Sequence, residues 1–488
     1  MAWAMAAALV AGILQNFVFL AVAFFLVVRG VYKAHMSRAD ALLLSLLCGL
    51  LYCHGHFSID RYRLRISEFD RQASALVGPL LVEGWVSSYP QQAYGQTRFE
   101  FVTVIGGVTH RLLVRAPDFL IGYGDSLRMR VRPRDSRGLR PGYLLSRGVS
   151  GSVGALGGSV TRLPGHGGSI AKRSVMWPIH DRVRRETVKG LGAGAGLPLA
   201  LLLGERGLLT RNVREAFAIL GVSHLLALSG LHLGFVALVL MLVTRQLHRW
   251  RGRIVLASLA LYVAVVGFIL SLYRALIMAT LLIAAKGVHR PPRLSQALVI
   301  AFVVMLLLYP FALFSVAFQL SFLATLAVIL IVGKLGAAAE GGYWMRVWHG
   351  FRSTVQISVA VQIVLLPVLL TYFGGISLVA PLATAVLVVP VIVLLVSSGI
   401  GVAVSMISVD AGRVFYELIE PAAATFDRFI LLSADIVPDH AVIPVPSLFL
   451  YYLGLSLIWF SRTRVIIKLF GILLVASAWL PVFSNLDF

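Results

Sequence analysis

Two histidines, a serine and two glycines interrupt an otherwise apolar run of this chain. They are His224, Ser229, Gly230, His232 and Gly234. Ionisable side chains are costly at membrane depth, so their default interpretation is a functional site. If the run is one helix, Ser229 and His232 are neighbours, and His224 shares the same broad face. We expect this face to line or gate a water-filled pore. The alternative is that the histidines only hydrogen-bond buried carbonyl groups.

The motifs around these residues argue against catalysis. No Gly-x-Ser-x-Gly surrounds Ser229, and the sequence places no acidic partner beside Ser229 and His232. Gly230 and Gly234 form a Gly-x-x-x-Gly motif, which lets another helix backbone approach closely. The chain also lacks Gly-x-x-x-x-Gly-Lys-[Ser/Thr], the phosphate-binding loop of ATPases. We therefore expect no enzyme activity, and energy for any transport must come from elsewhere.

Three more polar side chains, Arg274, Gln319 and Ser321, fall in later apolar runs. A charged group at this depth faces the helix bundle or a cavity rather than lipid. Two kinds of partner stay open for Arg274: the phosphate backbone of a passing nucleic acid, or a protein group such as Glu205, Glu215 or a carbonyl. Gln319 and Ser321 are neutral, and we expect them to hydrogen-bond between helices.

The cysteines and histidines of the second apolar run do not predict a metal site. Cys48 and Cys53 are five residues apart on an expected helix and point in different directions, which suits packing rather than a disulfide. His54 and His56 form a His-x-His pair with Asp60 after it, but this spacing does not match a metal-binding motif. We expect no metal and no cofactor.

Composition predicts the setting of these residues. The 488 residues are 59% hydrophobic and 13% charged, with a mean hydropathy of +0.88. Soluble domains carry about 25% charged residues. We predict a polytopic α-helical membrane protein with about 10–12 transmembrane helices, each near 20 residues long. The expected spans are 4–28, 39–56, 224–244, 254–271, 274–288, 295–311, 312–333, 353–373, 378–406, 414–436, 444–460 and 465–483. The first two form an N-terminal transmembrane hairpin, residues 1–56.

Basic residues predict the orientation. The net charge is +22, from 43 Lys and Arg against 21 Asp and Glu. Lys and Arg collect in cytoplasmic loops, although a polyanionic partner is another cause of such a charge. Five basic clusters are separated by even numbers of late spans, and they begin at Arg29, Arg245, Lys286, Lys334 and Arg462. The N-terminus, the segment after the second span and the C-terminus then face outside. The first span is too long for a cleaved signal peptide and lacks a basic start, so we expect it to be retained.

Residues 74–163 differ from the rest of the chain. Five β-forming runs alternate with turn signals, and they are 80–86, 98–105, 108–114, 126–131 and 153–162. Five short strands in this length predict a small, extracytoplasmic OB-like β-barrel. Residues 164–190 follow as a basic amphipathic linker, for which we expect docking on the membrane surface. The remaining spans make up residues 191–484.

OB-like barrels often bind single-stranded nucleic acid on a basic, aromatic face. Arg128, Arg130, Arg132 and Arg134 alternate along one strand and share one side of it. The other reading of this stripe is a solvated strand near anionic lipid headgroups. The candidate DNA-binding residues are Arg98, Phe99, Phe101, Arg111, Arg115, Arg128, Arg130, Arg132 and Arg134.

The chain resembles the ComEC family, the inner-membrane DNA-uptake channels of natural competence. The resemblance runs over residues 1–484 and is strongest around His224 and His232. The stretches that carry it are Gly204-Glu205-Arg206, Phe217 to His232, Ser271 to Ala275, Tyr309-Pro310 with Phe318 to Phe322, and Tyr372 to Gly374 with Pro381 and Pro390. Many relatives add a C-terminal metallo-β-lactamase-like nuclease domain, which we do not expect here because the sequence reaches Phe488 just after its last span.

The resemblance implies a multi-pass channel of the cell inner membrane that imports single-stranded DNA during natural transformation. It also implies partners: membrane lipid, a DNA receptor, a cytoplasmic helicase-like ATPase and a separate nuclease. The rival hypothesis is a proton-coupled secondary transporter of a small solute or lipid. Intramembrane histidines suit that function equally well, as do helices interrupted at Pro310, Pro367, Pro381 and Pro390. A membrane-embedded enzyme ranks last, because no catalytic set is visible.

Overall fold

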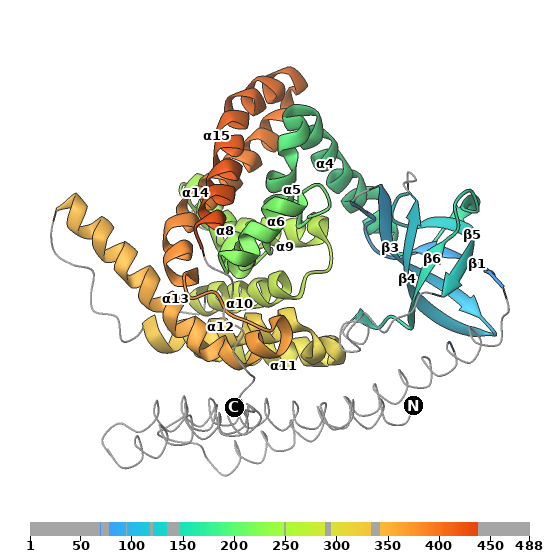
Figure 1. The fold of residues 1–488 in the computed structure, drawn as a ribbon, viewed down its shortest axis with the longest axis horizontal. Helices are drawn as coiled ribbons and strands as arrows, with labels where there is room; N and C mark the ends of the chain where they lie inside the picture. The colour runs from blue at the N-terminus through green and yellow to red at the C-terminus, as the bar shows by residue number, and fades with distance from the viewer. Residues whose placement is uncertain are drawn as a thin grey trace, which may run out of the picture. The chain divides into compact units, whose positions relative to one another are not determined.

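The structure is a computed structural model (Figure 1). It describes residues 69, 78–93, 95–117, 121–133, 147–247, 250–287, 294–332 and 342–437. The expected spans before residue 57 and after residue 443 lie outside the described residues, as does Arg134. By its internal contacts the chain divides into two units, one of residues 57–360 and 377–439, the other of residues 1–56, 361–376 and 440–488. In the second unit only residues 361–376 are described, as the end of one helix.

The first described region is a closed β-barrel. Its strands are β1 (Leu80–Val86), β2 (Gln91–Ala93), β3 (Gln96–Ile105), β4 (Val108–Pro117), β5 (Asp125–Pro133), β6 (Gly151–Ala155) and β7 (Thr161–His166). Hydrogen-bonded neighbours run β1, β3, β4, β6, β5 and back to β1, which closes a ring of five. Only the β4–β6 pair is parallel, while β2 extends β3 and β7 extends β5. The expected small, five-stranded β-barrel is confirmed.

Alternation along the strands builds the barrel core. On β3, Phe99 and Phe101 point inward while Arg98 is exposed. On β5, Leu127 and Met129 point inward between exposed arginines. Period-2 alternation of this kind places one face of each strand in the core. Two strand expectations were wrong: β2 was missed, and the run predicted over 153–162 is two strands, β6 and β7, separated by a turn.

Residues 172–191 connect the barrel to the helices. A π-helical segment (Lys172–Met176) continues into α4 (Trp177–Leu191). The buried residues of α4 are His180, Val183, Thr187 and Leu191, spaced three or four apart as on one helix face. Val183 and Leu191 belong to a core cluster shared with other helices. The apolar face that we expected to dock on the membrane surface therefore packs against protein instead.

The rest of the described chain is helical. The elements are a short 3₁₀ turn (Gly192–Ala195), α5 (Gly196–Leu203), α6 (Arg211–Ile219), α7 (Ser223–Leu226), α8 (Gly230–Val243), α9 (Arg251–Val266), α10 (Leu270–Gly287), α11 (Leu294–Leu308), a 3₁₀ turn (Pro310–Phe314), α12 (Val316–Val332), α13 (Tyr343–Phe373), α14 (Ala380–Ile407) and α15 (Val409–Asp435). Each expected span between 254 and 436 overlaps one of the helices α9 to α15, because long apolar runs predict helices directly.

Two groups of helices share cores. One core joins α5, α6 and α7 to α14 and α15 through residues such as Phe217, Leu394 and Ile430. The other joins α4, α5, α8, α9 and α10 and includes Tyr416 of α15. Helices α5 and α15 contribute to both cores and so connect the two groups.

Two described helices, α13 and α14, are long and apolar enough to cross a membrane by length and composition. Helices α8, α11 and α12 are apolar but shorter, and so is the apolar part of α10. Helix α15 fills the expected span 414–436 but carries acidic residues, among them Glu417, Glu420 and Asp427. Pro367 and Pro390 lie inside α13 and α14, whereas Pro310 and Pro381 begin helical segments. The expected interruptions thus fall at helix starts for two of the four prolines.

The barrel core predicts a sharp contrast between neighbouring residues of β3. Phe101→Ala should destabilise the barrel by about 3–5 kcal/mol, because it removes a fully buried ring and leaves a cavity. Arg98→Ala, on the outward side of the same strand, should change stability by no more than about 0.5 kcal/mol. Hydrogen exchange of β3 and β4 amides in the full-length protein measures both. Equal effects of the two substitutions would contradict the inward orientation of Phe101.

Candidate functional site

The polar run from His224 to Gly234 is not one helix. Helix α7 ends at Leu226, and Ala227 and Ser229 have extended backbone with ψ angles of 128° and 172°. Helix α8 begins only at Gly230. The expectation of one helical face holding His224, Ser229 and His232 was therefore wrong. An extended break of this kind exposes backbone groups, and such irregular backbone is tolerated at membrane depth only inside protein or beside a cavity.

Ser229 and His232 instead form the N-terminal cap of α8. The hydroxyl of Ser229 accepts from the Leu231 N–H at 3.3 Å and lies 3.0 Å from Nδ1 of His232. The same Nδ1 lies 3.4 Å from the Ser229 backbone N–H, which donates to it. This reciprocal capping box satisfies N–H groups that a helix start leaves without partners. Because Nδ1 accepts, the proton of a neutral His232 is on Nε2, and that atom is buried with no hydrogen bond among the described residues.

Arg274 of α10 lies against this cap. It is 7% exposed, and its Nη1 donates to the Ser321 carbonyl and the Thr325 hydroxyl of α12. Its guanidinium is 5.6 Å from the Phe322 ring centre. A Cβ atom on Gly230 would lie 3.0 Å from Nη2 of Arg274, so the guanidinium approaches α8 where there is no side chain. Ion pairs to carboxylates are absent for Arg274 within the described ranges, so Glu205 and Glu215, two partners left open by the sequence, are not bonded to it.

The remaining pore candidates have different surroundings. Ser321 accepts from Arg274 through its backbone carbonyl, so this contact between helices does not use the hydroxyl whose bonding we expected. Gln319 donates from Nε2 to the Leu313 carbonyl at 2.8 Å, within the 3₁₀ turn just before its own helix, so it is not the interhelical bond that we expected. His224 is exposed on α7. A Cβ on Gly234 would meet no atom within 4 Å, so the Gly-x-x-x-Gly motif gives close packing only at Gly230.

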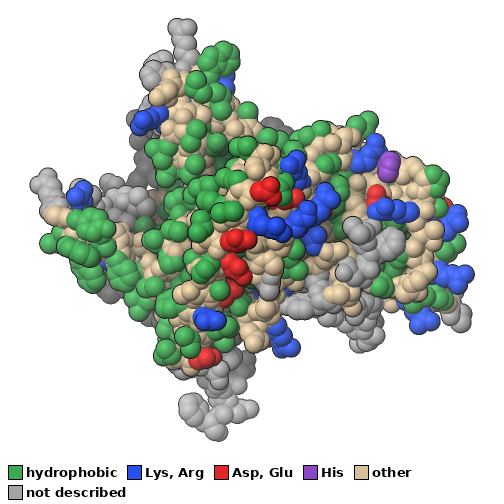
Figure 2. Space-filling view, turned by 90° about the horizontal axis from the view of Figure 1, so that it is seen from above, with side chains coloured by type: hydrophobic (Ala, Val, Ile, Leu, Met, Phe, Trp, Pro, Cys, Tyr) green, Lys and Arg blue, Asp and Glu red, His purple; other side chains and the backbone are tan. Residues whose placement is uncertain are grey.

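The barrel candidates divide into core and surface. Phe99 and Phe101 are 1% and 0% exposed, so they fill the barrel and cannot stack on bases there; that expectation was wrong. Arg98, Arg128, Arg130 and Arg132 are exposed, as the alternation predicts. In Figure 2, Lys and Arg side chains stand apart from one another on the surface of the barrel, at the right of the view.

Some of the barrel arginines are already paired. Arg128 pairs with Glu83 of β1 at 2.5 Å, and Arg111 lies 3.8 Å from Glu100. Arg98 and Arg115 are opposite each other on β3 and β4. Among described carboxylates, none forms an ion pair with Arg130 or Arg132 on β5. Of the described members of the stripe, these two arginines are therefore the most available to a phosphate backbone.

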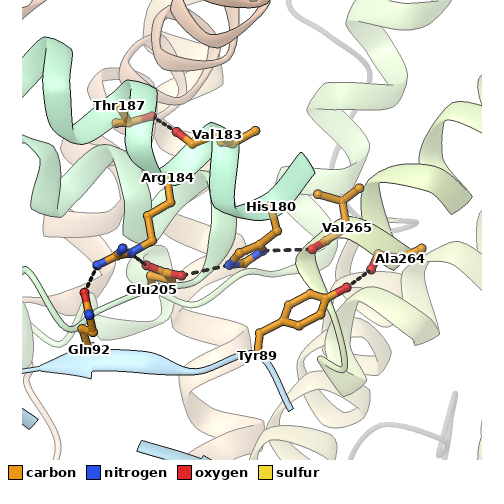
Figure 3. A network of polar contacts seen from close by, with 9 residues as sticks. All are labelled: Tyr89, Gln92, His180, Val183, Arg184, Thr187, Glu205, Ala264 and Val265. Carbon is orange, nitrogen blue, oxygen red and sulfur yellow. Dashed lines mark hydrogen bonds and ion pairs between the residues drawn. The ribbon is translucent and has the colours of Figure 1, made fainter. Parts of the chain in front are cut away.

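A polar cluster that the sequence did not predict joins the barrel to the helices (Figure 3). Glu205, in the loop after α5, is 6% exposed. Its Oε1 is 2.9 Å from Nε2 of His180, and its Oε2 accepts from Nε of Arg184 at 3.1 Å. Arg184 also donates to the side chain of Gln92 on β2. His180 Nδ1 lies 2.9 Å from the carbonyl of Val265.

Tyr89 completes this barrel–helix junction. Its ring lies 4.7 Å from the His180 ring and 5.4 Å from Trp177. Its hydroxyl donates to the Ala264 carbonyl at the end of α9 at 3.1 Å. Burial, with smaller effects of Tyr123 and Tyr273, raises the pKa of Tyr89 to about 12, so the phenol stays a neutral donor. Gly267 has φ +99°, and a Cβ there would lie 3.2 Å from the Tyr89 ring, so this position requires glycine.

Comparison with known proteins identifies the helical part. The family model described as "Competence: Competence protein" matches residues 201–477. The chain belongs to this competence protein family. The matched segment contains the α8 cap, Arg274 and Glu205, whereas the barrel and α4 precede it. The family resemblance carried by the sequence motifs is thereby confirmed.

Two curated relatives support this membership. The chain is 29% identical to ComE operon protein 3 of Bacillus subtilis (strain 168) over 263 residues, 53% of this chain and 33% of the relative. It is 32% identical to Competence protein ComA of Neisseria gonorrhoeae over 348 residues, 64% of this chain and 47% of the relative. The matches thus span about a third to a half of the length of these two relatives. No solved structure matches the chain.

The α8 cap gives a direct prediction. Ser229→Ala should destabilise the start of α8 by about 1 kcal/mol, because it removes the hydroxyl that caps the first turn. Ser229→Asn should restore most of this, since Asn caps as well as Ser. Hydrogen exchange of α8 peptides measures the change. Ser223→Ala is the control, because Ser223 is exposed on α7 and forms no cap. An equal effect of both alanine substitutions would contradict the capping role.

Proposed function

We propose that this competence-family protein carries single-stranded DNA across the cytoplasmic membrane during natural transformation. The observation that supports it best is the family match over residues 201–477, which covers the helices holding the α8 cap and Arg274. One of the two relatives, ComA of Neisseria gonorrhoeae, is named a competence protein. Family membership and the apolar helices α13 and α14 support a membrane protein. From chain length and hydropathy, we propose about 10–12 transmembrane helices in all.

In this proposal the barrel receives the strand outside the cytoplasm. Its exposed arginines on β5 stand on one side of the strand, with Arg130 and Arg132 not ion-paired within the described part of the chain. Backbone phosphates bind such side chains without reading sequence. Phe99 and Phe101 are buried and cannot stack on bases, so in this proposal the arginines bind the strand electrostatically. The N-terminus and C-terminus share the outer side.

Along the helices, the strand would pass the junction of α8, α10 and α12. The amino end of a helix carries a partial positive charge, and here it adjoins the buried guanidinium of Arg274. Two positive features meet without a carboxylate bonded to Arg274 among the described residues. A phosphodiester is the kind of group that such a place attracts. Ser229, Gly230 and His232 form the helix start at this junction. His224 and Gly234 lie near them in sequence, and Gln319 lies near Ser321, a partner of Arg274.

The chain would work with other proteins. It carries no phosphate-binding loop of the Walker type. A cytoplasmic helicase-like ATPase would pull the strand, a receptor would deliver DNA to the barrel, and a separate nuclease would degrade the other strand. Lipid would surround the apolar faces of α13 and α14. We propose no catalytic role for this chain.

Arg274 tests the conducting role. Arg274→Gln should lower transformation of a competent host that carries only the variant by about 10- to 100-fold, the range of one lost charge-assisted contact. Arg274→Lys should give an intermediate loss, because it keeps the charge but not the planar fork. Arg253→Gln, exposed on α9, should transform normally. Immunoblots must show equal protein levels. Normal transformation by Arg274→Gln would rule out the assigned path.

The barrel stripe tests the receiving role. Binding of a labelled single-stranded oligonucleotide to the full-length protein in detergent is measured by anisotropy at several salt concentrations. The double substitution Arg130→Gln, Arg132→Gln should reduce the salt slope by about 0.7 for each phosphate contact removed. The double substitution Arg211→Gln, Arg214→Gln, at two exposed arginines of α6, is the charge-matched control. Wild-type protein without any salt-dependent binding would favour the rival, a transporter of a small solute or lipid.

A further inference from the structure

The His180 ring lies between two hydrogen-bond acceptors. Nδ1 is 2.9 Å from the Val265 carbonyl oxygen, and Nε2 is 2.9 Å from Oε1 of Glu205. A neutral imidazole has one N–H and one lone pair, so it can donate to only one of these oxygens. The other contact would set two lone pairs against each other where His180 is only 2% exposed. Both ring contacts are therefore satisfied only when the His180–Glu205 pair carries one extra proton, compared with a neutral imidazole and an ionised carboxylate.

The groups that face this pair define its charge. From its own helix, Arg184 donates to the other oxygen of Glu205 at 3.1 Å. From the barrel, the neutral Tyr89 ring lies 4.7 Å from the His180 ring, and the Tyr123 ring lies 5.7 Å from the Tyr89 ring. From α9 come only the carbonyls of Ala264 and Val265; Tyr273 of α10 is near Tyr89. Within the described residues, the carboxylate thus has two cationic partners once the proton is bound.

The same two side chains hold the barrel. The Tyr89 ring rests on His180, and Gln92 reaches Glu205 through Arg184. Without the extra proton, either the imidazole or the carboxylate must turn away from the other. The first movement disturbs the Tyr89 contact and the second disturbs the Arg184 bridge. Docking of the barrel loop from Tyr89 to Gln92 therefore depends on whether the His180–Glu205 pair holds the extra proton.

We propose that His180 and Glu205 form a proton-binding site that locks the Tyr89–Gln92 loop of the barrel to the helices. When the loop is docked, the His180–Glu205 pair holds one proton that it does not hold when the loop is released. Docking therefore strengthens as pH falls and weakens as pH rises. This lock goes beyond DNA uptake, because it does not depend on what the protein transports.

Hydrogen exchange of the full-length protein in detergent, followed by mass spectrometry between pH 6 and pH 8, tests the lock. The readout is the protection of peptides covering residues 87–93, after correction for the intrinsic pH dependence of exchange. One linked proton changes the opening equilibrium by at most about tenfold per pH unit. We expect protection to fall several-fold per unit as pH rises. Protection that does not change with pH would overturn the proposal.

Glu205→Gln is the decisive variant. The amide that it introduces can donate to Nε2 of a neutral His180 while Nδ1 still donates to Val265, so every contact is satisfied without an extra proton. The loop should stay protected across the pH range, and the pH step should disappear. A wild-type pH step in Glu205→Gln would also overturn the proposal. His166→Gln, which changes an exposed histidine on β7, should keep the wild-type step.

Arg184→Gln separates the proton site from simple loss of docking. It removes the bond to Gln92, so protection should be lower at every pH. The His180–Glu205 pair remains, and without the nearby guanidinium it holds its proton to higher pH. We therefore expect the step to persist with its midpoint moved upward. A step that vanishes, or a midpoint that moves downward, would contradict a proton held between His180 and Glu205.

Discussion

The buried carboxylate of Glu205 is the constraint on which the arrangement of the first unit depends. Removing a carboxylate from water costs several kcal/mol, and the cost is recovered only through well-placed partners. Both side-chain partners, His180 and Arg184, come from one face of α4. Arg184 then holds Gln92 of the barrel. One anion in the loop after α5 therefore connects three segments that are far apart in sequence, and an error in any of them would leave a charge buried alone.

The break before α8 shows a second use of local chemistry. Three residues leave the helical conformation so that Ser229 can cap Gly230 and the following turn. The break brings the capped start of α8 beside the guanidinium of Arg274. A continuous helix through His224 and His232 would have put the middle of a helix there, with no positive end. The functional meaning of the motif therefore comes from its backbone as much as from its histidines.

Some of this was predictable from the sequence for simple physical reasons. Alternation along a strand and long apolar runs are local signals, so strands β1, β3, β4 and β5 and helices α9 to α15 followed from them. The same alternation, applied to β3, already placed Phe99 and Phe101 on the side opposite Arg98, and reading it strictly would have assigned both to the core. The extended break had a weaker signal, the Ser-x-x-His spacing before an apolar run, which resembles a capping box.

The barrel–helix junction had no such signal. Tyr89 looked like part of a turn and His180 like part of an amphipathic linker, because their partners are 175 and 25 residues away. Sequence periodicity predicts one helix or strand at a time and does not predict which of them pack together. Glu205 was visible as a family motif residue, but its pairing with α4 rather than with Arg274 depends on three-dimensional packing alone.

The closed ring of the barrel has a consequence for how the domain meets other molecules. In the described structure β1 is paired on both sides, with β3 and with β5, and the strands that extend the ring, β2 and β7, are 3 and 6 residues long. Unpaired strand edges are templates on which another chain can add a strand. Here the ring itself offers almost none. A nucleic acid or protein must therefore meet the barrel through side chains, and neighbouring copies of the barrel have little means of joining by sheet extension.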